Sequence, residues 1–199
     1  HHHAHMASCM ADNSLSGDVI GVIWDGTGLG TDGTSWGGEF LTGGFGGFER
    51  AGHIRPLKLI GGDKAMGDIS RTAFYLLKDS LCSTENIENG ELYSKLLEAD
   101  INCPVSTGMG RLFDGVAAMI GIKEQCSYEG QGAILLEAAA AEGITDSYTV
   151  SIEDNIFDWR DMINGICSDL KHREEKEIIS AKFMNTLILM AVSVCRNIR

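Results

Sequence analysis

The feature that most constrains the fold is a glycine-rich stretch at residues 27–50, TGLGTDGTSWGGEFLTGGFGGFER, in which glycine recurs every two or three positions. Ordinary loops do not need so many glycines. The aromatic residues within the stretch, Trp36, Phe40, Phe45 and Phe48, alternate weakly with small or polar residues. This pattern predicts short hairpin strands whose turns use positive φ at glycine.

Hydrophobic periodicity predicts the remaining elements. Residues 2–13 are typical of an amphipathic helix, and DVIGVIWDG at 18–26 predicts a strand closed by a turn. A further strand is expected at 53–63, and most of the chain after residue 63 has helical spacing. A last strand is expected at 146–154. The fold class is therefore mixed α and β, and 199 residues suit one domain spanning 1–199.

The expected helix at 63–81 is followed by the clearest helical pattern, at 106–121. Ser106 or Thr107 could cap it. Its apolar face repeats at helical spacing and consists of Leu112, Val116, Met119 and Ile120. The last helix is expected to direct a similar set toward the core, namely Ile179, Phe183, Met190 and Val194.

Charge and composition exclude several classes of protein. The formal net charge is −12 and the basic residues are scattered, so the field repels phosphate polymers and nucleic acid is not an expected partner. No stretch approaches the unbroken apolar length that spans a bilayer, and no signal peptide is recognisable. Six cysteines without a C-x-x-C pair argue against a disulfide framework or a zinc ribbon. We expect a soluble, cytoplasmic protein with no membrane partner.

The chain opens HHHAHMASCMADN, and terminal histidines are often left over from cloning. Two observations oppose that interpretation: Ala4 breaks the run, and the expected helix follows without a linker. His1 and His5 are four residues apart, so a helix places both imidazoles on one face, as a single metal ion requires. His2 and His3 point to other faces, and at least one is expected at the surface or beside a ligand. The spacing alone leaves a tag and a metal site both open.

Asp25 ends the expected strand at 18–26 and is followed by Gly26, Thr27 and Gly28. A carboxylate beside amides exposed by glycine suits a site that holds a metal and a phosphate together. The same residues also form an ordinary Asx turn at the end of a strand.

Five motifs in this order, HHHAHMASCMADN, WDGTGLGTDGTSWGGEF, GGDKA, GRLFDGVAAMIG and YEGQGAILLE, resemble the carbamoyltransferase domain of the HypF family, which matures nickel-iron hydrogenases. The resemblance covers nearly the whole chain. It implies part of the actin-like, two-lobed ASKHA fold, shared with the enzymes that place threonylcarbamoyl on tRNA. It also implies a fragment incomplete at both ends, without the family's adenosine loop, its final N-D-G-G turn and its N-terminal domains.

The resemblance assigns the metal ligands to His1, His5 and Asp25. It therefore favours a metal site over a tag at the amino terminus. Two imidazoles and a carboxylate suit zinc or iron, whereas calcium and magnesium prefer more oxygen ligands.

The family's nucleotide pocket corresponds to three segments of this chain: a glycine loop, the GRLFD motif and the YEGQ motif. The residues it implies are Gly26, Thr27, Gly28, Gly30, Arg111, Asp114, Gly130 and Gln131. Gly108 and Gly110 are expected to leave amides accessible at a helix start, where the helix dipole favours an anion. Asp114 could accept hydrogen bonds from ribose hydroxyls. Without the resemblance, Arg111 and Asp114 read as an i, i+3 ion pair on a solvated face.

The implied activity is transfer of a carbamoyl group from carbamoyl adenylate to the C-terminal cysteine of the partner HypE, toward a cyanide ligand of the hydrogenase. Carbamoyl phosphate and ATP would be used through the absent N-terminal domains, and the partner supplies the nucleophile, so no catalytic nucleophile is assigned. We expect the isolated fragment to be inactive. The alternative is a metal- and nucleotide-binding ASKHA scaffold or switch without transfer chemistry, since one fold hosts many functions.

Overall fold

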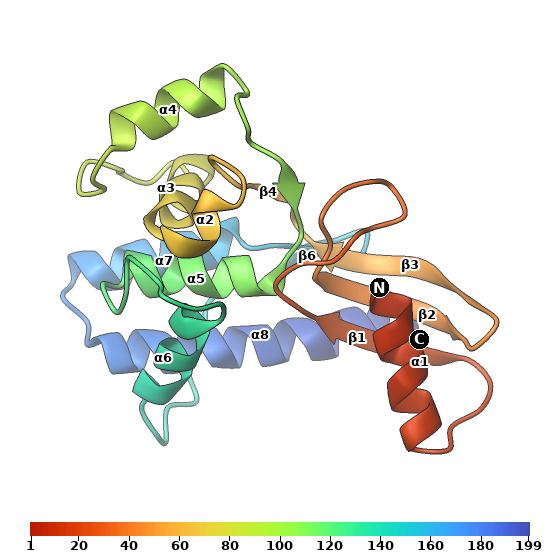
Figure 1. The fold of residues 1–199 in the computed structure, drawn as a ribbon. Helices are drawn as coiled ribbons and strands as arrows, with labels where there is room; N and C mark the ends of the chain where they lie inside the picture. Colours follow the sequence, from red (N-terminus) through yellow and green to blue (C-terminus); the bar gives the residue numbers. More distant parts are fainter.

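The computed structural model describes residues 1–199 and consists of a sheet region and a helical region that lie side by side (Figure 1). The order of elements along the chain is α1 His2–Asp12, β1 Val19–Trp24, β2 Gly38–Gly44, β3 Gly47–Ile54, β4 Leu57–Lys58, α2 Lys64–Gly67, α3 Ser70–Asp79, α4 Gly90–Glu98, β5 Val105–Ser106, α5 Met109–Met119, α6 Gln131–Ala139, β6 Ser151–Glu153, β7 Ile156–Asp158, α7 Arg160–Lys171 and α8 Lys176–Ile198. The mixed α and β class expected from the sequence is confirmed.

The main sheet has five strands in the order β1-β2-β3-β7-β6. Strands β1, β2 and β3 form an antiparallel meander, β7 runs parallel to β3, and β6 is antiparallel to β7. The β2–β3 hairpin turns at residues 45–46, within the glycine-rich stretch. The prediction of hairpin strands in this stretch is therefore correct.

Both faces of the sheet are covered, which explains why β2 is so strongly buried. On one face α1 contributes Met6 and Met10 to a small cluster with Trp36 and Leu41. The adjacent residue of β2, Phe40, points to the other face, because successive side chains of a strand alternate, and joins the main core. Helix α8 runs along this second face and contacts β1 and β7 (Figure 1).

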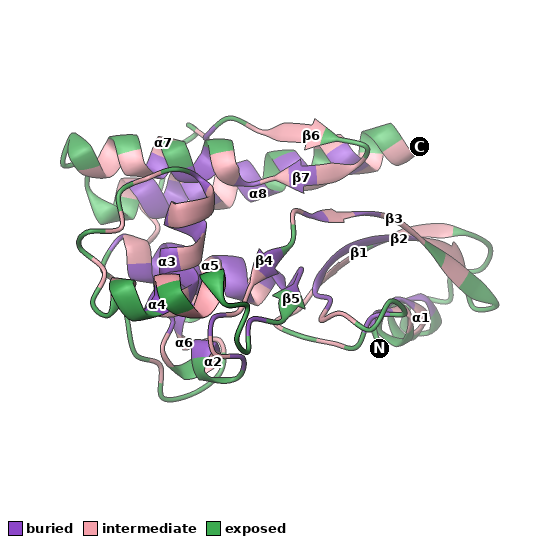
Figure 2. Ribbon diagram, turned by 90° about the horizontal axis from the view of Figure 1, so that it is seen from above, coloured by how far each residue is buried: buried purple, intermediate pink, exposed green.

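The helical region is built around α5, which packs against α3 and α6. Leu112 and Val116 of α5 and Phe183 and Met190 of α8 are fully buried in one core that continues to Phe40 of the sheet. Figure 2 shows the buried segments gathered where α3, α5 and α7 meet, with the outer helix α4 largely accessible. The predicted core faces of α5 and α8 are correct, except that Met119 is only half-buried.

Three local predictions are wrong. The strand expected at 53–63 is interrupted at Pro56, which has no amide hydrogen for a ladder, and only β4 follows it. The helix expected at 63–81 is divided at Asp68, whose carboxylate accepts hydrogen bonds from Ser70 Oγ and Arg71 Nε. The strand expected at 146–154 shortens to β6.

Helix α8 is more apolar than the sequence analysis expected of any stretch of the chain. It is long and apolar enough, by length and composition alone, to cross a membrane, and 44% of its most apolar window is buried inside the fold. The statement that no stretch reaches such a length is therefore wrong. Its apolar composition has a structural cause here, because Ile179, Phe183, Leu187, Met190 and Val194 all belong to the main core.

Candidate functional site

The amino-terminal end of α1 lies beside the end of β1, and this brings the predicted metal ligands together. Met6 of α1 lies over Gly21 of β1, where a side-chain β-carbon would stand 2.7 Å from the Met6 sulfur. This close approach holds the helix against the sheet. His1 and His5, one turn apart, then face Asp25, the first residue after β1.

The side-chain donor atoms of these three residues have the spacing of a metal site. His1 Nε2 lies 3.0 Å from Asp25 Oδ2 and 3.2 Å from His5 Nε2, and His5 Nε2 lies 3.7 Å from Asp25 Oδ2. Two ligand atoms about 2.0–2.1 Å from a tetrahedral metal are separated by roughly 3.3 Å. The chemistry and spacing of the donors therefore fit zinc or iron, as the sequence suggested.

The two remaining histidines of the opening run are not free surface residues. His2 is 2% exposed, neither ring nitrogen has a hydrogen-bond partner, and burial lowers its pKa. One of its nitrogens lies within 4.8 Å of donor atoms of both His1 and Asp25, so His2 belongs to the cluster and was missed as a ligand candidate. His3 is half-buried, stacks on Phe48 and contacts the Gly44 carbonyl oxygen through Nε2.

The glycine loop after Asp25 packs tightly against neighbouring side chains, and at two positions only glycine leaves room for them. A β-carbon at Gly28 would stand 2.3 Å from the His1 ring, and one at Gly30 would stand 2.2 Å from Trp36. The Gly30 amide donates to the Thr34 carbonyl. Thr27 and Gly28 donate no amide hydrogen bond to the chain, so these two amides are free for an anion.

The amides expected to be accessible at the start of α5 are in use. The Gly110 N–H donates to the Asp25 carbonyl, and the Gly108 N–H donates to Ser106 Oγ. Gly108 is the residue before α5, and neither Ser106 nor Thr107 caps the helix. The sequence prediction was wrong here because the Gly110 amide docks α5 onto the strand end that carries Asp25, whereas the Gly108 amide is used locally by Ser106.

An ion pair between a fully buried carboxylate and a partly exposed guanidinium holds the loop. Glu39 of β2 is fully buried and accepts hydrogen bonds from Arg50 Nε at 2.6 Å, from the Gly37 and Gly38 amides and from Thr107 Oγ1. The Arg50 guanidinium also stacks on Trp36, 4.0 Å from the ring centroid. This network connects the hairpin, the loop and the residues before α5, and no local sequence pattern predicts it.

The second predicted group, Arg111 and Asp114, is also buried rather than solvated. Both side chains are 3% exposed, and Arg111 Nη1 lies 3.1 Å from Asp114 Oδ2. Arg111 reaches the glycine loop, since a β-carbon at Gly26 would stand 3.2 Å from its Nη2. The interpretation as a surface ion pair is therefore wrong, and the two residues lie beside the loop.

The YEGQ segment completes this cluster from the start of α6. Gly130, in the left-handed region with a φ of 79°, precedes α6, and a β-carbon on Gly132 would stand 2.8 Å from Asp114 Oδ1. Glu129 places Oε1 3.9 Å from Arg111 Nη2; it belongs to the YEGQ motif but was not among the predicted site residues. Gln131 instead serves the local loop, accepting from the Ser127 amide at 2.9 Å.

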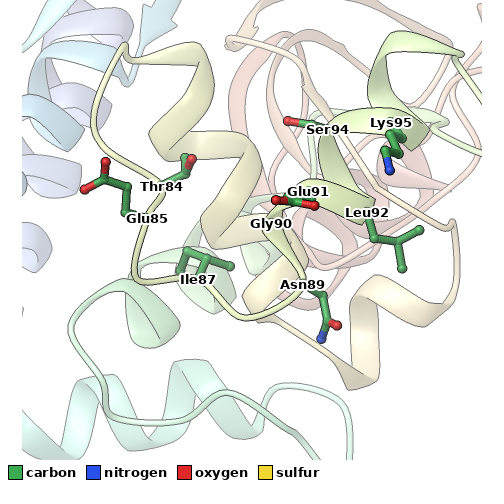
Figure 3. A pocket seen from close by; sticks show the side chains of 9 residues that line it. All are labelled: Thr84, Glu85, Ile87, Asn89, Gly90, Glu91, Leu92, Ser94 and Lys95. Atoms are coloured by element: carbon green, nitrogen blue, oxygen red, sulfur yellow. The ribbon is translucent and has the colours of Figure 1, made fainter.

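Of two surface hollows, one lies at the glycine loop and the other lies away from the predicted site. One hollow of about 560 Å³ borders the glycine loop and includes Thr27, Gly28 and Ser35 in its lining. Another, of about 760 Å³, lies over the start of α4 and is lined entirely by one segment, residues 84–95 (Figure 3). It contains no predicted site residue.

Burial raises the pKa of Asp114 to about 6, with Glu129 contributing in the same direction and Arg111 opposing them. In the unfolded chain the carboxyl group has its ordinary pKa of 3.8. Between pH 4 and pH 6 the folded protein therefore keeps a proton on Asp114 that the unfolded chain has already released. The contribution of Asp114 to stability is therefore lost as the pH rises from about 4 to about 6.

We expect Asp114→Asn to remove this contribution. Between pH 4 and pH 7 the free energy of unfolding of the unsubstituted protein should fall by up to about 3 kcal/mol relative to the variant. Urea denaturation of both proteins across this range measures the difference, in which the other carboxylates cancel. Parallel pH profiles would show that Asp114 titrates normally.

A family model described as the carbamoyltransferase Kae1-like domain, second subdomain, matches residues 21–199. The chain belongs to this family. It is 34% identical to the carbamoyltransferase HypF of Synechocystis sp., covering 98% of this chain and 29% of that protein. It is 42% identical to the HypF of Rhodobacter capsulatus over 71% of this chain and 20% of the relative.

Solved HypF structures have the same fold. A full-length HypF crystallised in the phosphate- and nucleotide-bound form superposes with a TM-score of 0.90 at 36% identity, covering all of this chain and 33% of that one. The HypF of T. kodakarensis gives a TM-score of 0.84 at 27% identity, over 98% of this chain and 28% of that one. The Kae1-like domain has the actin-like ASKHA fold, so the fold inferred from the motifs is confirmed. The chain spans about a third or less of these relatives.

Proposed function

We propose that this chain takes part in transfer of a carbamoyl group from carbamoyl adenylate to the C-terminal cysteine of HypE, toward the cyanide ligand of a hydrogenase. The observation that carries the proposal is that the predicted metal ligands and Arg111 lie at the same glycine loop. Asp25, with His1 and His5, lies at one end of the loop, and Gly26 lies against Arg111. A metal and an anionic ligand could therefore be held side by side.

Each group has a distinct role in this proposal. The free amides of Thr27 and Gly28 donate hydrogen bonds to an anionic oxygen, where fixed donors stabilise developing charge without reorganisation. Asp114 accepts from ribose hydroxyls. A relative of the same fold crystallised with phosphate and nucleotide, and this supports a nucleotide beside the glycine loop.

His1, His5 and Asp25 would hold zinc or iron, which when bound supplies Lewis-acid polarisation of a carbamoyl or phosphoryl oxygen. The thiolate of the partner attacks the carbamoyl carbon, and AMP leaves. The chain need not contribute a nucleophile. Carbamoyl phosphate and ATP are consumed earlier, by parts of HypF that lie outside the matched third.

The test is transfer of labelled carbamoyl to a peptide that ends in the HypE cysteine. We expect little transfer by the 199-residue chain alone. When the chain replaces the matching third of the solved HypF, we expect transfer that depends on Asp25. Asp25→Asn should lower it by at least about 100-fold, because the loss of a direct metal ligand exceeds the 10–100-fold effects of outer groups.

The control peptide has alanine in place of cysteine and should stay unlabelled. The folded replacement protein must first be shown to bind AMP. Nucleotide binding without any labelled peptide would contradict the transfer proposal and favour a scaffold or switch.

A further inference from the structure

The Arg111 side chain is buried but leaves hydrogen bonds unmade. The residue is 2% exposed, and its Nε and Nη1 have no hydrogen-bond partner. Nη1 is close to Asp114, at 3.1 Å, but the contact lacks hydrogen-bond geometry. A guanidinium has five N–H donors, and unmade hydrogen bonds are costly for a buried charge. The arrangement suits a ligand that supplies acceptor oxygens.

Glu129 covers Arg111 from the solvent side without satisfying it. Its side chain is 64% exposed, and Oε1 lies 3.9 Å from Arg111 Nη2, too far for a hydrogen bond. Oε1 also stands 3.0 Å from the place of a β-carbon on Gly26. The Glu129 carboxylate therefore occupies the gap between the glycine loop and the guanidinium.

The charges in this gap are not balanced. One guanidinium faces two carboxylates, those of Asp114 and Glu129, at 3.1 and 3.9 Å. An incoming anion that displaced Glu129 would replace one negative group beside Arg111 with another. A phosphate oxygen with hydrogen-bond geometry would also gain the donors that Glu129 leaves unused, because guanidinium pairs well with phosphate.

We infer that Arg111 binds a phosphate group of the ligand and that Glu129 competes for this position, so that Glu129 sets the affinity of the site for phosphate. The inference rests on the proposed function for a nucleotide ligand, and it assigns the phosphate to Arg111 and the ribose to Asp114. It also predicts that the Glu129 side chain moves away from Gly26 when the anion binds.

The test uses inorganic pyrophosphate, so it does not depend on recognition of the nucleoside. Calorimetric titration of the 199-residue chain should show pyrophosphate binding about tenfold tighter for Glu129→Gln than for the unsubstituted protein, because a competing charge is removed. Glu124→Gln is the matched control. Glu124 is exposed in the same connection between α5 and α6 and makes no ion pair, so its replacement should change the affinity less than twofold.

A second measurement locates the anion. In the amide NMR spectrum of Glu129→Gln, pyrophosphate should shift the Gly26 and Gly28 signals, and adding Arg111→Lys should reduce the gain in affinity. Equal or weaker binding by Glu129→Gln, or no pyrophosphate binding by any of the proteins, would overturn the inference. Titration with adenosine and AMP separately tests the nucleotide. If Glu129→Gln binds pyrophosphate more tightly but neither adenosine nor AMP binds, the nucleotide assignment fails while the anion site stands.

Discussion

Replacing His5 with alanine should lower the affinity of the chain for zinc by more than about 100-fold, since loss of a direct ligand exceeds the 10–100-fold effects of outer groups. His5 Nε2 lies within 3.7 Å of both His1 Nε2 and Asp25 Oδ2, so its removal leaves two clustered donors from this proposed set. Competition with a chromophoric chelator measures the affinity, and elemental analysis of the purified protein measures the bound metal.

The matched control is His53→Ala. His53 lies on β3, its Nδ1 is 2.8 Å from the Ile54 carbonyl oxygen, and it takes no part in the cluster. It should keep the unsubstituted affinity. Equal losses in the two variants would indicate nonspecific binding to surface imidazoles and would contradict the metal site at α1.

His2→Ala adds information to the same experiment. Because a His2 nitrogen lies near donors of His1 and Asp25, a loss as large as that of His5→Ala would mark His2 as a ligand. A small loss would mark it as a packing residue between α1 and the glycine loop.

Replacing Glu39 with alanine should lower the free energy of unfolding by about 3 kcal/mol, the upper end of the effect expected when buried donors lose their acceptor, while Arg50 keeps Asp32 as a partner at 3.3 Å. The change would deprive Arg50 of its closest carboxylate and would leave the Gly37 and Gly38 amides and Thr107 Oγ1 without their shared acceptor. Urea denaturation followed by circular dichroism measures the effect.

Glu49→Ala is the control for this variant. Glu49 lies next to Arg50 on β3, is exposed and makes no ion pair, so the stability should change by no more than about 0.5 kcal/mol. A loss for Glu39→Ala as small as that of the control would show that the network beneath the loop does not stabilise the fold.

Much of the fold was predictable because local periodicity reflects the surroundings of one element. The helix at 2–13, the strand expected at 18–26 and the hairpins in the glycine-rich stretch each follow from spacing or turn chemistry. The three-residue strand β7 was missed, because it is too short to show a period. The strand at 53–63 was overextended, because apolar residues on both sides of Pro56 mask the interruption.

For the site, the sequence alone determined that His1 and His5 share a helix face, and the family motifs placed Asp25 with them. Only the tertiary structure decided what these residues meet. The packing of α5 against the end of β1 used the Gly110 amide, and the start of α6 brought Glu129 to Arg111. The physical reason is that spacing within an element fixes directions over one or two turns. A contact between residues 111 and 129, or between 26 and 110, depends on how separate elements pack, which no local pattern contains.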